Sequence, residues 1–268
     1  MGAPGEGDIP RDQEAVPPEA RARSSVRIAV VMPAMNAART LERTVSAIPA
    51  GWADELILVD DKSTDDTVAV ARRLPLHVIW HPHNVGYGGN QKTCYLWALQ
   101  NEADIVVMLH PDGQYEPTLI PDLVAPILRG EADLVLGSRL AVPGMARAGG
   151  MPLYKYVANR VLTTIENVVM GTRLTDLHTG YRAYSRELLM TVPFLRNSLD
   201  FAFDSEMLMQ AAHFGFRIVD VPAKSIYFED ASSISLGPAT VYGLKTLRLA
   251  GRLVLHRAGV LRSSKFKP

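Results

Sequence analysis

Short apolar runs alternate along the first half of the chain with segments in which apolar residues recur at helical spacing. The runs ELILVD and DIVVML are apolar almost throughout, as expected for strands with both faces buried. Strands are predicted at 26–32, 55–60, 76–80, 104–109 and 132–137, with helices between them at 38–48, 64–73, 88–101 and 117–129. Such alternation is typical of the α/β class, in which helices flank a mainly parallel, twisted sheet.

The pattern changes after Arg139. A Gly-rich connection at 143–150 precedes a long helical stretch from Tyr154 to about Met170, and a region rich in polar motifs follows. No linker-like composition separates the two halves, so we expect one domain whose second half covers the open edge of the first. The predicted organisation is a disordered leader at 1–25, a main domain at 26–230 with halves at 26–140 and 141–230, and a basic amphipathic segment at 231–268.

The charge is unevenly distributed along the chain. Its 28 Lys and Arg balance 28 Asp and Glu, but no acid follows Asp230 and seven bases do, which leaves the preceding part at about −7. From Val241 the tail has helical spacing, with Lys245, Arg248 and Arg252 along one stripe. Such a helix either lies on an anionic membrane surface or docks on the protein with its basic side in water.

The remaining composition limits the cellular setting. Cys94 is the only cysteine, so no disulfide forms within the chain, and its helical surroundings favour a buried thiol over a nucleophile. No apolar run approaches the ~20 residues that cross a bilayer, and the N-terminus lacks the apolar centre of a signal peptide. We expect a cytoplasmic protein that attaches to the cytoplasmic face of the membrane if its tail binds lipid, with no nucleic-acid partner.

Candidate chemistry appears at the ends of the predicted strands. In DIVVMLHPDGQY, residues 104–115, an apolar run ends in His110, Asp112 and Gln114, which a period of two directs roughly the same way. Strand ends in open α/β sheets face the crevice where ligands bind, so a metal or phosphate site is one interpretation. An ordinary turn that contains Pro111 and Asp112 is the other.

Two more strand ends face the same crevice. Pro33 and Asn36 follow the first strand, and Asp60 and Asp61 end the second, ahead of the next helix. A carboxylate there accepts hydrogen bonds from a base N–H or a ribose hydroxyl, and a local turn is the alternative.

The segment HPHNVGYGGNQKT, residues 81–93, places Gly86, Gly88 and Gly89 between a strand and a helix. Glycine lets the backbone approach a ligand closely, and the following helix N-terminus favours anions. As a dinucleotide fingerprint the loop is weak, because Gln91 replaces the third glycine and the loop follows the third strand. Ligand contact and a tight turn both stay open.

In chain order, VVMPAMN, LVDDKSTDDT, NVGYGGN, LHPDGQY, LGSRL, TGYRAY and FAFDSEML together resemble the family 2 glycosyltransferases over roughly residues 26–230. The resemblance is greatest to the dolichyl- and polyprenyl-phosphate mannosyl- and glucosyltransferase branch. It implies the Rossmann-like nucleotide-diphospho-sugar transferase fold, known as GT-A, and a nucleotide-sugar donor.

The resemblance also implies roles for individual residues. Contacts with the nucleotide sugar would come from Pro33, Asn36, Asp60, Asp61, Gly88, Asp112 and Arg139. A divalent metal, Mg²⁺ or Mn²⁺, would bridge the diphosphate from Asp112, Gln114 and His110. The family usually has an acid where this chain has His110, and imidazole suits Mn²⁺ better than Mg²⁺.

Further residues would serve the acceptor. Asp176, His178 and Arg182 lie in TDLHTGYRAY, which matches an acceptor-side loop, and Asp204 and Glu206 match the acidic catalytic motif. Inverting transfer to a hydroxyl needs a base, for which we prefer Asp204. An acceptor phosphate is already anionic, so Asp204 or Asp176 would then only position it. Asp204 as the N-cap of its helix is the alternative.

The expected function is that of an inverting hexosyltransferase that moves a sugar from a UDP- or GDP-sugar to polyprenyl phosphate at the membrane surface. A soluble small molecule or a glycan is the alternative acceptor. A nucleotidyltransferase would need a Gly-rich basic loop after the first strand, and PAMNAARTL is a poor version of one. A catalytically silent nucleotide-sugar binder is supported only by His110.

Overall fold

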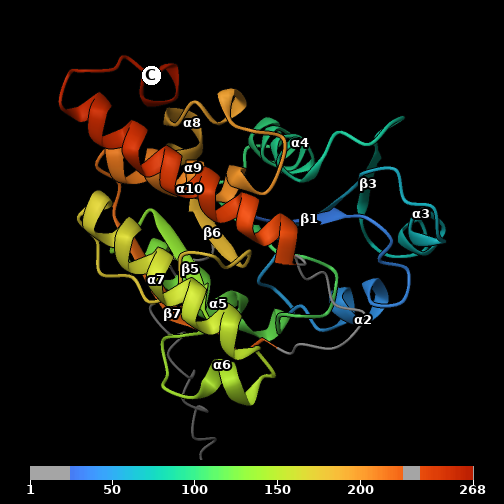
Figure 1. The fold of residues 1–268 in the computed structure, drawn as a ribbon. Coiled ribbons are helices and arrows are strands. Elements are labelled where there is room, and N and C mark those ends of the chain that lie inside the picture. The colour runs from blue at the N-terminus through green and yellow to red at the C-terminus, as the bar shows by residue number, and fades with distance from the viewer. Residues whose placement is uncertain (1–24, 226–235, 268) are drawn as a thin grey trace, which may run out of the picture.

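The computed structural model describes residues 25–225 and 236–267. Its centre is a seven-stranded sheet with helices on both sides (Figure 1), in the order β3-β2-β1-β4-β6-β5-β7. The strands are β1 (Ile28–Ala34), β2 (Glu55–Asp60), β3 (His77–Trp80), β4 (Ile105–Met108), β5 (Leu134–Ser138), β6 (Arg182–Ser185) and β7 (Ile218–Pro222). The leader predicted for 1–25 lies outside the described residues, except for Ser25.

The sheet is mostly parallel, and β6 is the exception. Strands β2 and β4 run parallel to β1, β3 runs parallel to β2, and β7 runs parallel to β5. Strand β6 lies antiparallel between β4 and β5. The predicted α/β class with a mainly parallel sheet is therefore confirmed. Strands β6 and β7 were not predicted; β6 is the short RAYS segment inside a polar motif.

The helices are α2 (Leu41–Ser46), α3 (Thr67–Ala71), α4 (Tyr87–Gln100), α5 (Ile120–Leu128), α6 (Met145–Ala148), α7 (Leu153–Met170), α8 (Arg186–Thr191), α9 (Ala202–His213) and α10 (Leu236–Arg257), with 3₁₀ turns η1 (Pro117–Leu119), η2 (Phe194–Arg196) and η3 (Ser264–Phe266). The helix predicted at 64–73 begins only at Thr67. Its start is delayed because the Asp65 carboxylate accepts the backbone N–H groups of Thr67 and Ala38 and holds the preceding residues in a turn.

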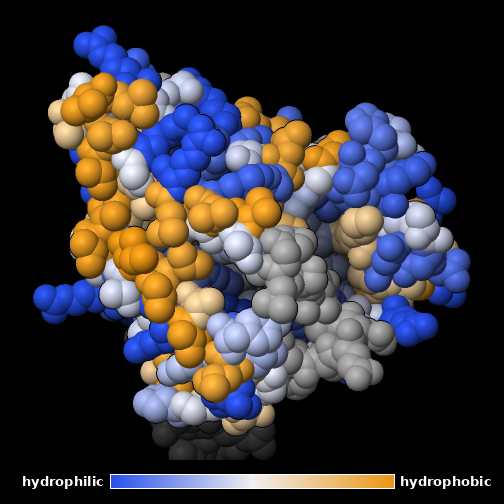
Figure 2. All heavy atoms as spheres, viewed as in Figure 1, coloured by the Kyte–Doolittle hydropathy of each residue, from blue (hydrophilic) through white to orange (hydrophobic). Residues whose placement is uncertain are grey.

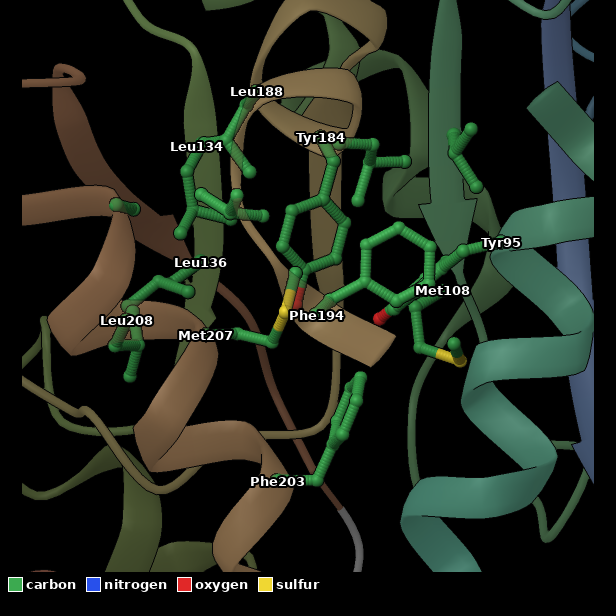
Figure 3. Packing of buried hydrophobic residues seen from close by; sticks show 14 of the residues in the cluster. Tyr95, Met108, Leu134, Leu136, Tyr184, Leu188, Phe194, Phe203, Met207 and Leu208 are labelled. Atoms are coloured by element: carbon green, nitrogen blue, oxygen red, sulfur yellow. The ribbon is translucent and has the colours of Figure 1, made fainter. Parts of the chain in front are cut away.

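Each face of the sheet carries its own hydrophobic core. Val30 and Val107 belong to one cluster, whereas their neighbours Val31 and Val106 belong to the other, as the alternation of side chains along a strand requires. Figure 3 shows the second cluster, in which the rings of Tyr95 and Tyr184 meet edge to face with centroids 5.2 Å apart. Between them the two cores bury both faces of the strands whose ends form the site.

The second half of the chain joins the same sheet through β6 and β7. Helix α10 packs on α7 and α9, as the red and yellow ribbons show in Figure 1. None of the helices in the described ranges combines the length and the apolar character needed to span a bilayer.

Candidate active site

Asp60 ends β2, and one of its two carboxylate oxygens has no hydrogen-bond donor among the described residues. Its Oδ2 accepts the backbone N–H of Ser63 at 3.0 Å. Its Oδ1 is buried without a hydrogen-bond partner among the described residues, and the residue is only 2% exposed. A buried carboxylate oxygen without a donor costs free energy unless a ligand supplies one. The side chain therefore suits a ligand N–H or hydroxyl, as predicted for a nucleoside.

Asp61 has a different role from its neighbour. Its carboxylate accepts the backbone N–H groups of Val85 at 2.8 Å and Gly86 at 3.0 Å, and Nδ1 of His81 lies 3.0 Å away. These contacts fix the glycine loop to the end of β2. Asp61 thus holds the glycine loop in place, and its predicted contact with the nucleotide stays a prediction.

Pro33 and Asn36 shape the end of β1. Pro33 lies beyond Val31, the last residue of β1 that pairs with β4, so the sheet loses no hydrogen bond to the proline. Asn36 has a left-handed backbone with φ of 55°, and its Oδ1 accepts the backbone N–H of Thr64 at 2.8 Å. Asn36 thus ties the loop after β1 to the loop after β2.

The glycine loop packs against the protein's own backbone. A Cβ added to Gly88 would lie 2.4 Å from the carbonyl oxygen of Ser198, and one added to Gly86 would lie 2.6 Å from that of Leu199. The Gly88 N–H donates to the Leu199 carbonyl at 2.8 Å. Close approach to the backbone at 198–199 accounts for the absence of a Cβ at both glycines, and the predicted ligand contact of Gly88 stays a prediction.

The loop after β4 places Asp112 and Gln114 side by side. Oδ1 of Asp112 accepts the Gln114 backbone N–H, and Oδ2 accepts Nε2 of the Gln114 side chain, both at 3.0 Å. No group of three or more His, Cys, Asp or Glu side chains in the described ranges could hold a metal ion by itself. Mg²⁺ bound with substrate phosphates needs only one or two carboxylates from the protein, so Asp112 fits a site that a diphosphate completes.

His110 turns from that loop towards a second carboxylate. Its Nε2 lies 3.2 Å from the hydroxyl of Tyr87, and the same hydroxyl donates to Oδ2 of Asp204 at 2.7 Å. Gln91 donates to the other oxygen of Asp204 at 3.1 Å. Gly180 makes room for the imidazole, because a Cβ there would lie 2.7 Å from the ring.

The Tyr87 hydroxyl has one proton to donate, so its two contacts indicate which ring nitrogen of His110 carries a proton. Burial and then the charge of Asp204 raise the pKa of Tyr87 well above its usual value, so the hydroxyl stays protonated and donates to Asp204. The contact with His110 then needs a proton on Nε2, which leaves the lone pair on Nδ1. Nδ1 is the atom through which His110 would bind a metal or accept a donor. Sequence patterns gave no sign of Tyr87 beyond its place in the glycine loop.

Arg139 and Asp176 form a buried ion pair. Nε and Nη2 of Arg139 donate to the two oxygens of Asp176 at 2.6 and 3.0 Å, and Asn159 donates to Oδ1 at 2.9 Å. Burial alone would raise the pKa of Asp176, but the charge and hydrogen bonds of Arg139 outweigh it and lower the pKa to about 2. Asp176 is 0% exposed. It holds Arg139 in place, and its predicted catalytic role stays a prediction.

Two other predicted site residues also serve the fold here. Arg182 is 0% exposed, and its guanidinium donates to the backbone oxygens of Thr179 at 2.8 Å and Asp204 at 2.9 Å. It joins the polar loop to α9, and its predicted place on the acceptor side stays a prediction. Glu206 accepts from the Ser198 N–H at 2.6 Å and pairs with Lys265 at 2.9 Å, so it faces the C-terminal residues and not Asp204.

His178 connects the polar loop to two helices. Its Nδ1 lies 2.8 Å from the hydroxyl of Tyr242 on α10, and its Nε2 lies 3.1 Å from Oε2 of Glu166 on α7. The Tyr242 hydroxyl is also 2.9 Å from Oγ of Ser205, next to Asp204 on α9. Glu166 and Tyr242 were not predicted, because neither lies in a motif.

Lys155 is in the first turn of α7. Burial and then the positive charge of Arg139 lower the pKa of Lys155. Lys155 belongs to a helical stretch in which a lone lysine carries no sequence signal.

A profile described as "Glycosyl transferase family 2" matches residues 29–192 of this chain. The UDP-N-acetylglucosamine–dolichyl-phosphate N-acetylglucosaminyltransferase of Methanococcus voltae is 29% identical over 235 residues, which cover 81% of this chain and 92% of that protein. The polyprenol monophosphomannose synthase of Mycolicibacterium smegmatis is 29% identical over 230 residues, covering 83% of this chain and 84% of that protein.

The fold also matches solved structures. The glucosyl-3-phosphoglycerate synthase of Mycobacterium tuberculosis, in complex with Mn²⁺, uridine diphosphate and glucosyl-3-phosphoglycerate, superposes with a TM-score of 0.62 at 24% identity. The match covers 91% of this chain and 84% of that chain. This likeness concerns the arrangement of sheet and helices.

Proposed function

The chain belongs to glycosyl transferase family 2, and we propose that it moves a sugar from a nucleotide-diphosphate donor to a polyprenyl phosphate at the cytoplasmic face of the membrane. The observation that carries this proposal is the link His110–Tyr87–Asp204, which holds the carboxylate on α9 beside the loop after β4. A donor diphosphate at that loop would have its anomeric carbon next to Asp204.

The donor half of the site rests on two carboxylates. The open Oδ1 of Asp60 accepts a nucleobase N–H or ribose hydroxyl, and Asp112 lies at the neighbouring strand end. Asp112 and Nδ1 of His110 are the groups that would hold Mg²⁺ or Mn²⁺, which would supply positive charge for the donor diphosphate. The Mycobacterium tuberculosis synthase, whose fold this chain shares, was crystallised with Mn²⁺ and uridine diphosphate.

The acceptor half rests on Asp204, Arg139 and Lys155. An oxygen of the acceptor attacks the anomeric carbon from the side opposite the diphosphate; the new C–O bond forms as the old one breaks, and the nucleoside diphosphate leaves with the electron pair. The configuration inverts. A phosphate acceptor needs no deprotonation, so Asp204 orients it while Arg139 and Lys155 hold its charge. With a hydroxyl acceptor, Asp204 would take the proton.

A soluble anionic acceptor is the second candidate. The same cations would hold the phosphate or carboxylate of a small acid, and the structural neighbour carries glucosyl-3-phosphoglycerate. We favour the lipid phosphate because two relatives that match most of this chain are named for transfer to dolichyl phosphate or for synthesis of a polyprenol monophosphomannose.

The test is a transfer assay with UDP- and GDP-sugars, Mg²⁺ or Mn²⁺, and either a polyprenyl phosphate in detergent or 3-phosphoglycerate. Mass spectrometry detects the product and NMR its anomeric configuration. Asp112→Asn should reduce transfer to either acceptor about 100-fold or more, and Asp204→Asn should do so for the hydroxyl acceptor, whose proton it would take. The control is Asp66→Asn, an exposed carboxylate at the start of α3 with no cap hydrogen bond. The absence of transfer and of donor hydrolysis with every donor would refute the proposal.

A further inference from the structure

Helix α7 is apolar on the side that faces away from the protein. Its buried residues are Asn159, Thr163, Glu166 and Met170, most of them polar. The residues at helical spacing on its outer side are Leu153, Val157, Val161, Ile165 and Val168, whose exposed fractions run from 37% to 79%. A water-exposed helix normally has the opposite arrangement. Within 25–225 and 236–267, the outer side of α7 therefore has no apolar partner.

Helix α10 and the residues after it extend this apolar surface. We define the α7–α10 face by its exposed large apolar side chains: Leu153, Tyr154, Val157, Val161, Ile165, Val168, Val241, Leu244, Leu247, Val254, Leu255, Val260 and Leu261. Figure 2 shows apolar side chains over α7 and over both ends of α10, with hydrophilic ones between them. Exposed apolar surface of this extent marks a site of interaction with a protein or a membrane.

The exposed ionised side chains of α7 and α10 themselves are cations, although Lys245 pairs with Asp200, which precedes α9. The exposed ionised side chains of the two helices include Arg160, Lys245, Arg248 and Arg257. The only acid in either helix is Glu166, which is 0% exposed. Apolar side chains bordered by cations complement the surface of a bilayer that contains anionic lipid, where each nearby Lys or Arg contributes about 1 kcal/mol.

A second copy of the chain fits this face less well. A two-fold interface places the same patch against itself. Arg160 and Arg248 would then be brought close to the cations of the partner with no exposed acid on either helix to pair with them, and juxtaposed like charges are unfavourable.

The inner sides of the same two helices hold the polar loop of the site. Glu166 of α7 and Tyr242 of α10 contact His178 at opposite ring nitrogens. The outer face and the acceptor half of the site are therefore two sides of one helix pair. A lipid surface at the face would lie next to the acceptor half.

We propose that the α7–α10 face binds the surface of a bilayer containing anionic phospholipid and so presents the acceptor half of the site to a lipid-borne phosphate. The proposed binding to the bilayer is argued only from the residues of the α7–α10 face. Only its consequence for the acceptor rests on the proposed function.

The test is co-sedimentation of the full-length protein with phosphatidylcholine vesicles, with and without phosphatidylglycerol. We expect binding to the anionic vesicles, reduced about tenfold or more by Val161→Asp with Val168→Asp. The charge variant Arg160→Glu with Arg248→Glu should reduce binding to anionic vesicles to the level of neutral ones. Matched controls are Met190→Asp and Leu195→Asp, 63% and 57% exposed, in α8 and η2; they should bind as the unaltered chain does.

Donor hydrolysis without acceptor should be unchanged in every variant, which shows that the fold and donor half are intact. The inference is overturned if the unaltered protein does not bind anionic vesicles, or if Val161→Asp with Val168→Asp binds equally well. Light scattering that shows a dimer dissociated by this variant would also overturn it, in favour of an interface between copies. Transfer to polyprenyl phosphate in detergent without vesicle binding contradicts this inference alone; vesicle binding without such transfer contradicts only the proposed acceptor.

Discussion

The hydroxyl of Tyr87 lies 2.7 Å from Oδ2 of Asp204, although 117 residues separate them in the chain. The same hydroxyl contacts Nε2 of His110 at 3.2 Å. One oxygen atom thus connects the glycine loop, the end of β4 and the start of α9, and it orients both the proposed catalytic carboxylate and the imidazole beside the proposed metal.

Tyr87→Phe should slow sugar transfer about ten- to a hundredfold, since a hydrogen bond to a charged group contributes about 1.5–3 kcal/mol. The loss should appear mainly in kcat, because the substituted hydroxyl does not hold the donor. The ¹⁵N shifts of His110 should show its tautomer changing. Tyr181→Phe is the control, because that buried hydroxyl binds the carbonyl of Glu116 at 3.2 Å on another part of the fold. Unchanged kcat and ¹⁵N shifts in Tyr87→Phe would contradict this assignment.

Asp60→Asn should weaken binding of the nucleoside diphosphate while the fold persists. The amide oxygen can still accept the Ser63 N–H, but the open Oδ1 loses its charge, and we expect Kd to rise about tenfold or more by calorimetry. Asp61→Asn should instead lower the Tm of the protein. The two oxygens of Asp61 accept the backbone N–H groups of Val85 and Gly86 and so hold the glycine loop in place. Equal Kd values for Asp60→Asn and the unaltered chain would remove Asp60 from the donor site.

The Arg139–Asp176 pair should make stability depend on pH in the acid range. The pKa of Asp176 falls from a usual value of 3.8 to about 2 in the folded protein. Its stabilisation is therefore fully present above about pH 4 and is lost as the pH falls through 2. Asp176→Asn removes the carboxylate that pairs with the buried Arg139 guanidinium, so the free energy of unfolding at pH 7 should drop by about 3–5 kcal/mol.

Denaturant titration of both proteins at several pH values tests this. The difference between Asp176→Asn and the unaltered chain should narrow as the pH is lowered from 4 towards 2. A difference that stays constant over that range would show that Asp176 contributes no charge to the folded state.

Gly180→Ala should damage the site more than the fold. The new Cβ would lie 2.7 Å from the imidazole of His110, so the ring must shift away from Tyr87, and we expect transfer to fall about tenfold or more. Gly251→Ala is the control, because nothing lies within 4 Å of a Cβ there. Within α10 that change should raise stability by up to about 1 kcal/mol. Full activity in Gly180→Ala would show that His110 needs no fixed position.

The sequence by itself determined the strands that carry the site and the ends of those strands. The apolar runs around Val59 and Val107 specify strands buried on both faces, and a chain that alternates such strands with helices has few topologies open to it. Because parallel strands β1, β2 and β4 end at one edge, the sequence also predicted that Asp60 and Asp112 belong to the same crevice. Family membership, implied by motif order, was confirmed.

Only the tertiary structure decided which polar side chains form hydrogen bonds with the protein itself. Asp60 and Asp61 are adjacent and chemically identical. Asp60 nevertheless has a carboxylate oxygen without a donor among the described residues, whereas Asp61 accepts from a loop whose glycines lie more than 20 residues away. Asp176 forms an ion pair with Arg139, which lies 37 residues away in the sequence. Likewise, helical spacing predicted α7 but not that its polar side is buried. Local patterns encode an element and its faces; the partner of each face depends on segments remote in sequence, which no local pattern records.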